Sequence, residues 1–162
     1  MSMGGAFRAV IVFLIFILLH YTLRPLLGWR APMDFLLLGL LMAAVRVRPG
    51  NAALIGFALG LVSDSLAPEA LGAGALAMTA VGFSASYLKA VFFADNIVLN
   101  AFFFFLGKWM FDVIYFLVAQ SVHGAELVQQ IFLWSPLSAA VTAAVGVLLL
   151  FIMRPLLEPS TA

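Results

Sequence analysis

Residues 51–74, NAALIGFALGLVSDSLAPEALGAG, decide the fold of this chain. They predict an apolar helix with Gly56 and Gly60 on one face and a carboxylate, Asp64, near its far end. A charged Asp costs about 2.5 to 3.5 kcal/mol at the centre of a bilayer, so Asp64 must lie near an interface, be paired, or be protonated. Two glycines four residues apart let another helix backbone approach closely. That neighbour is either a helix of this chain or a helix of another protein.

The composition indicates an integral membrane protein. The chain has 162 residues, of which 65% are hydrophobic and 9% charged, whereas about a quarter of the residues of a soluble domain are charged. The mean hydropathy is +1.19. A net charge of +1 gives no reason to expect nucleic-acid binding, and two His without any Cys give no reason to expect a zinc site or a disulfide framework. We expect no cofactor.

At about 20 residues per span, the apolar segments predict a single all-α membrane domain of six transmembrane helices, without a soluble domain. The expected spans are residues 6–23, 32–48, 51–66, 75–93, 97–118 and 136–153. Ser135 followed by Pro136 is the signature of a helix start. The preceding stretch, 126–134, has the pattern of a short interfacial helix.

Spans two and three are expected to form an antiparallel hairpin, because Pro49-Gly50-Asn51 turns the chain tightly between them. Asp34, near the start of span two, and Asp64, near the end of span three, should therefore lie at the same membrane face.

Lys108 and Asp112 fall near the middle of the fifth span, four residues apart and thus on one helix face. Two opposite charges at this depth are expected to pair inside the bundle. Ionisable residues within a membrane are candidates for proton relays and substrate cavities, but a pair that only neutralises itself is a structural feature. Both interpretations stay open for this pair.

The basic residues predict the orientation of the chain. With both termini in the cytoplasm, the inner face carries five basic residues and the outer face two. The inner group is Arg8, Arg46, Arg48, Lys89 and Arg154, and the outer group is Arg24 and Arg30. An enzyme is not expected, because the chain lacks a phosphate-binding GxxxxGK[ST] loop, an HExxH motif, a GxSxG motif and a Cys nucleophile.

The region from Asp34 to about Tyr87 resembles the MreD family of bacterial rod-shape proteins. The resemblance lies in Asp34-Phe-Leu-Leu-Leu, a tight basic turn, the run Gly60-Leu-Val-Ser-Asp64 and then Leu71-Gly72. It implies an inner-membrane protein without enzymatic activity that works with MreC and, through it, with the MreB filament and the glycan polymerase and transpeptidase of cell-wall elongation. It also implies a fold similar to the substrate-binding subunits of energy-coupling-factor transporters.

The family offers no catalytic residues to carry over, so the resemblance maps Asp34, Gly56, Gly60, Asp64 and Gly72 only as pattern positions. A single-span partner needs a groove of small residues to dock against. We therefore expect an MreC-like helix to contact the hairpin of spans two and three. The residues of this expected surface are Asp34, Gly39, Ala43, Gly56, Gly60, Asp64, Glu69 and Gly72. The alternative function is a small-molecule binding subunit of a membrane transporter, which the same layout and the Lys108–Asp112 pair would permit.

Overall fold

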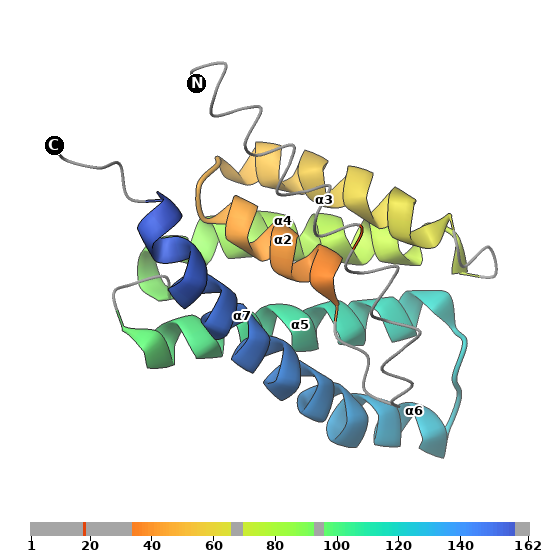
Figure 1. The fold of residues 1–162 in the computed structure, drawn as a ribbon. Coiled ribbons are helices and arrows are strands. Elements are labelled where there is room, and N and C mark those ends of the chain that lie inside the picture. The colour runs from red at the N-terminus through yellow and green to blue at the C-terminus, as the bar shows by residue number, and fades with distance from the viewer. Residues whose placement is uncertain (1–17, 19–33, 66–69, 93–95, 158–162) are drawn as a thin grey trace, which may run out of the picture.

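The computed structural model describes residues 18, 34–65, 70–92 and 96–157, and this part of the chain is helical without a strand (Figure 1). The expected first span, 6–23, lies outside the described residues except for Leu18. The helices are α2 (Phe35–Ala44), α3 (Pro49–Asp64), α4 (Ala73–Phe92), α5 (Ile97–Ala119), α6 (Ala125–Gln129) and α7 (Ser135–Leu157), with a π-helical segment η2 (Gln130–Trp134) between the last two.

Two helical stretches of the described chain are long and apolar enough to cross a membrane. They are Ile97–Ala119 and Ala125–Phe151, whereas Phe35–Ala44 is apolar but shorter. The all-α class is therefore found, and six transmembrane helices remain a prediction.

Helix α2 forms the centre of the bundle. Nine of its ten residues are buried, and Leu36, Leu37 and Leu38 are 0% exposed at three successive positions. A helix that is buried on every side needs no polar face, which explains its uniformly apolar sequence. It packs against α3, α4 and α5, and Figure 1 shows it in front of α4 and beside α3.

The turn between α2 and α3 is fixed by hydrogen bonds to backbone carbonyls. Arg46 donates to the carbonyl oxygen of Met42 at 2.9 Å, which satisfies one of the free carbonyls at the end of α2. The carbonyl of Val47 accepts from Ser86 at 2.7 Å and from Lys89 at 2.9 Å, so α4 holds the turn in place. Pro49 then begins α3, where its missing N–H costs nothing.

The sequence predicts a separate interfacial helix at 126–134 and a new span from Pro136, but the structure has one continuous helical path through α6, η2 and α7. Pro136 has no N–H, and its ring would clash with the carbonyl four residues earlier in a regular α-helix. In the π-helical turn each N–H donates to the carbonyl five residues earlier instead of four, so the helix passes through Pro136 without the regular α-helical hydrogen-bond pattern. The N–H of Ser135, for example, donates to the carbonyl of Gln130. Ser135 has helical backbone angles, so it does not have the extended backbone of an N-cap that starts a new helix.

Candidate functional site

The carboxylate of Asp64 is buried and holds the start of α4. It accepts three backbone N–H groups, from Gly72 at 2.9 Å and from Gly74 and Ala75 at 3.0 Å each. The first N–H groups of a helix have no partner within the helix, and a carboxylate there also complements the helix dipole. Asp64 is only 2% exposed, so its hydrogen bonds replace the water that a charged group needs. The sequence requires Asp64 to lie near an interface, to be paired or to be protonated, and in the structure it is paired with backbone N–H donors.

Two glycines beside Asp64 make this arrangement possible. Gly72 has φ +96°, a conformation that side-chain-bearing residues rarely adopt. A Cβ on Gly74 would overlap the Asp64 carboxylate itself. The sequence Leu-Gly-Ala-Gly after the link therefore serves to bring backbone donors to the carboxylate.

Gly56 and Gly60 face α4 within the same chain. A Cβ at Gly56 would overlap the backbone of Met78, and a Cβ at Gly60 would overlap the backbone of Ala75. Both glycines are buried, and so is Gly39 in the central helix. The helix that approaches Gly56 and Gly60 is therefore a helix of this chain, α4, and not a helix of another protein. These three glycines are therefore not exposed to a partner helix.

Asp34 begins α2 as its N-cap, and its side chain accepts the N–H of Leu37 at 3.4 Å. It lies at the same end of the α2–α3 hairpin as Asp64 (Figure 1). Ala43 is half-buried in the last turn of α2. Glu69, the remaining member of the expected surface, lies outside the described residues.

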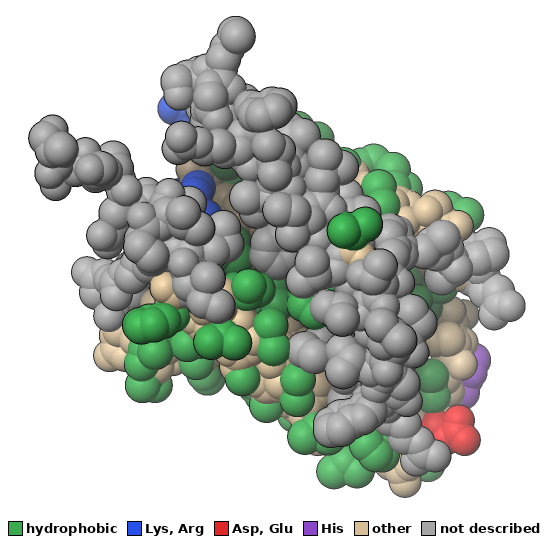
Figure 2. All heavy atoms as spheres, viewed as in Figure 1, with side chains coloured by type: hydrophobic (Ala, Val, Ile, Leu, Met, Phe, Trp, Pro, Cys, Tyr) green, Lys and Arg blue, Asp and Glu red, His purple; other side chains and the backbone are tan. Residues whose placement is uncertain are grey.

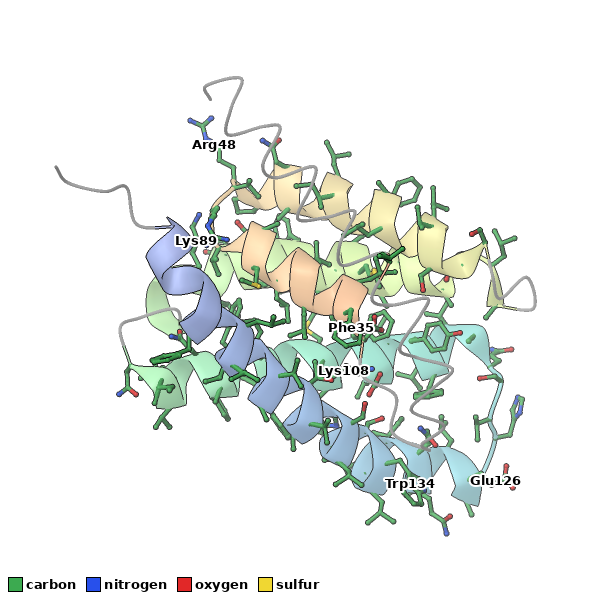
Figure 3. The ribbon with its side chains drawn as sticks, viewed as in Figure 1. Phe35, Arg48, Lys89, Lys108, Glu126 and Trp134 are labelled. Atoms are coloured by element: carbon green, nitrogen blue, oxygen red, sulfur yellow. The ribbon has the colours of Figure 1, made fainter. Side chains whose placement is uncertain are left out.

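Lys108 and Asp112 form an ion pair inside the bundle, with 2.5 Å between Nζ and Oδ1. Their side chains are 5% and 8% exposed, and Lys108 points into the bundle from α5 (Figure 3). The Lys108 ammonium also lies 5.0 Å from the centre of the Phe111 ring. Asp34 and Ser135 lie near the Asp112 carboxylate. Three helices, α2, α5 and α7, thus contribute polar groups to one buried cluster.

Buried hydroxyls on α7 extend this cluster. Ser135, Ser138 and Thr142 recur at helical spacing and are 1%, 4% and 0% exposed. Within the described residues, the hydroxyl of Thr142 has no hydrogen-bond partner, whereas that of Ser135 lies near the Asp112 carboxylate. Nothing in the sequence shows that α7 lies against the charged face of α5, so these hydroxyls do not stand out there as part of a polar cluster.

Trp109 is a further contact that the sequence did not predict. Its indole N–H donates to the carbonyl of Ile131 at 3.1 Å, so α5 supports the π-helical segment. Carbonyls in such a segment leave the regular α-helical register, and an outside donor satisfies one of them. The described residues contain no group of three His, Cys, Asp or Glu side chains placed to hold a metal ion.

The charges outside the buried cluster divide between the two ends of the bundle. Figure 2 shows Lys and Arg side chains at one end and acidic and His side chains at the other, with hydrophobic side chains among the described residues between them. Arg48 and Lys89 lie together at the basic end, and Glu126 lies at the opposite end (Figure 3). Many large apolar side chains of the helices are exposed, including Leu54 at 69% and Phe151 at 72%.

An apolar outer surface around buried, paired charges is the inverse of a soluble domain, and it defines this chain as a helical membrane protein. The family model described as rod shape-determining protein MreD matches residues 2–159, so the chain belongs to the MreD family. Membership supports a role in determining rod shape. A search of curated proteins and a search of solved structures gave no match.

Proposed function

We propose that this chain is a non-enzymatic scaffold of the bacterial cell-wall elongation machinery, which partners an MreC-like single-span protein in the inner membrane. Through that partner it acts with the MreB filament and with the elongation glycan polymerase and transpeptidase. The observation that carries the proposal is the use of Asp64, Lys108 and Asp112 within the bundle. Asp64 binds backbone N–H groups, and the other two bind each other. Ionisable side chains that are already bound in this way fit a rigid scaffold better than a site for acid–base chemistry.

The proposed partner surface is the outer face of α3. Leu54, Phe57 and Leu61 are 69%, 48% and 42% exposed and recur three and four residues apart, so they form one apolar stripe. The opposite face of α3, with Gly56 and Gly60, is covered by α4. An MreC-like helix that packs on α3 would contact this stripe, and its periplasmic part would then reach the Asp34–Asp64 end of the hairpin.

Site-specific crosslinking in cells tests this surface. A photoreactive amino acid at Phe57 should crosslink to the MreC-like protein encoded by the same organism, whereas the same amino acid at Leu148, on the exposed face of α7, should not. Equal crosslinking from both positions would contradict the α3 surface. Loss of rod shape on depletion of this chain, restored by the intact gene, tests the role itself.

The alternative, a small-molecule binding subunit of a transporter, makes a different prediction for the purified protein. A metabolite retained in stoichiometric amount after gentle detergent purification, with no MreC-like protein present, would favour the transporter subunit over the scaffold.

A further inference from the structure

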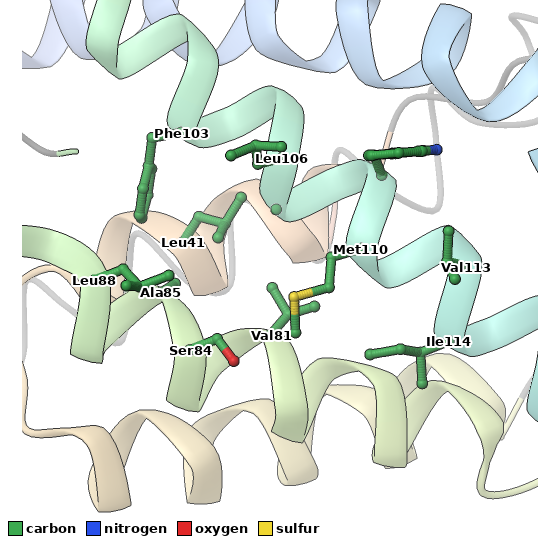
Figure 4. Close-up of a pocket in the computed structure, with 12 residues that line it drawn as sticks. Leu41, Val81, Ser84, Ala85, Leu88, Phe103, Leu106, Met110, Val113 and Ile114 are labelled. Carbon is green, nitrogen blue, oxygen red and sulfur yellow. The ribbon is translucent and has the colours of Figure 1, made fainter. Parts of the chain in front are cut away.

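An apolar groove of about 410 Å³ runs along the outside of the bundle between α4 and α5 (Figure 4). Leu88 and Phe103 line one end, and Ile114 lines the other, with Leu41 of the central helix also in the lining. No function assigned above uses this groove. Its shape, its lining and the charges at one end together identify an occupant.

The groove is elongated along α5. From Phe103 to Ile114 along α5, the groove is roughly 16 Å long at 1.5 Å per residue. A single extended hydrocarbon chain is much thinner than a helix and matches a long, narrow groove.

The lining offers hydrocarbon contacts and almost no hydrogen bonds. Ser84 contributes a hydroxyl group to the lining. Apart from the indole of Trp109, the other lining residues have no nitrogen or oxygen atom in their side chains. The indole N–H of Trp109 donates to Ile131, so this ring presents carbon to the groove. A ligand with polar groups along its length would lose hydrogen bonds to water here without replacement.

The end of the groove at Leu88 adjoins the basic end of the bundle. Lys89 follows Leu88 directly, and Arg46 and Arg48 lie in the turn that Lys89 holds. None of these three side chains has a carboxylate partner among the described residues. Cations beside an apolar groove complement an amphiphile with an anionic head and a hydrocarbon tail.

From these observations we infer that the α4–α5 groove binds one acyl chain of an anionic phospholipid, whose phosphate lies at the basic end formed by Arg46, Arg48 and Lys89. The chain then enters from the membrane face that these residues predict to be cytoplasmic and extends towards Ile114. This agrees with the enrichment of anionic lipids in the cytoplasmic leaflet.

Native mass spectrometry of the full chain from nanodiscs tests the site, with equal amounts of phosphatidylglycerol and phosphatidylcholine present. The wild-type chain should retain one phosphatidylglycerol. Ser84→Phe fills the groove and should abolish that retention, whereas Leu76→Phe, which places the same side chain at an exposed position of α4 outside the groove, should not. Equal retention of phosphatidylglycerol by the two variants would overturn the inference. So would the finding that Ser84→Phe loses a bound protein instead of a bound lipid.

The headgroup contact is tested separately. Lys89→Gln keeps a hydrogen-bond donor for Val47 and removes the charge. It should lower the preference for phosphatidylglycerol over phosphatidylcholine about fivefold, the effect expected of one basic residue near a membrane surface. An unchanged preference would overturn the assignment of the basic end.

Fluorescence quenching gives an answer even where Ser84→Phe does not fold. With Trp29→Phe and Trp134→Phe, Trp109 in the groove is the one remaining tryptophan. Phospholipids brominated in the acyl chain should quench it more strongly when the headgroup is phosphatidylglycerol than when it is phosphatidylcholine at the same mole fraction. Equal quenching by both lipids would contradict an anionic lipid in the groove.

Discussion

The carboxylate of Asp64 at the end of α3 accepts the backbone N–H of Ala75 at the start of α4, at 3.0 Å. One side chain therefore joins two helices across the link between them. Gly60, one turn before Asp64, packs against the same residue. The tight contact between α3 and α4 is consequently stabilised by a charge-assisted cap and by backbone packing at one place.

Asp64→Leu should strongly destabilise the protein, because it leaves three backbone N–H groups without their acceptor. The expected loss is about 3 kcal/mol or more, given 1 to 3 kcal/mol for each unsatisfied buried group. Asp64→Asn keeps one acceptor oxygen and should lose less. Thermal unfolding in detergent measures both, with Ser65→Ala at the exposed neighbouring position as the control. A Leu variant as stable as the control would contradict the capping role.

Gly60→Ala should also lower stability, since its Cβ would meet the backbone of Ala75, and a backbone does not move aside as a flexible side chain can. Overpacking of this kind costs roughly 1 to 3 kcal/mol. Gly50→Ala lies in the same helix with nothing within 4 Å of the added Cβ, and it should leave stability unchanged or raise it by up to about 1 kcal/mol. Thermal unfolding of the two variants side by side checks the prediction. If both behave alike, α3 and α4 do not meet at Gly60.

Lys108→Leu and Asp112→Leu should each lower the yield of folded protein more than the double variant does. Each single change leaves an uncompensated buried charge, whereas the double change leaves none. Size-exclusion chromatography of detergent-solubilised protein gives the folded yield. Additive losses would show that each residue depends on a partner other than the one 2.5 Å away.

The predicted orientation places both termini in the cytoplasm. A reporter that is active only in the periplasm should give no signal when fused after Ala162 and a signal when fused between Pro68 and Gly72. This follows from the five-to-two distribution of basic residues. The opposite pattern of signals would overturn the six-span arrangement and the outer position of Asp64 with it.

Local patterns in the sequence were sufficient to locate most helices. Asn96 directly precedes an apolar run, a typical position for a helix cap, and its side chain accepts the N–H of Val98 at 2.9 Å at the start of α5. Lys108 and Asp112 face each other because residues four apart on a helix are neighbours. Such features depend on a few adjacent residues, so they are visible in the sequence.

Features that depend on which helices meet were not visible in the same way. The GxxxG spacing of Gly56 and Gly60 showed that a backbone would come close, but not that it would be the backbone of α4. The role of Asp64 likewise depends on Gly72 and Gly74, eight and ten residues later, folding back to it. At Pro136 the cap-and-proline rule failed, because a π-helical turn carries the helix through the proline.

Helix α2 has consequences for how this protein tolerates sequence change. Its ten residues extend only about 15 Å, half of a hydrocarbon layer of about 30 Å, and they are enclosed by other helices. The thickness and chemistry of the bilayer therefore constrain the outer helices, whereas α2 is constrained by the volume available to it. Substitutions in α2 should be judged by side-chain size, as in the core of a water-soluble protein: an exchange of Leu38 for an equally hydrophobic but larger Phe meets a space already filled.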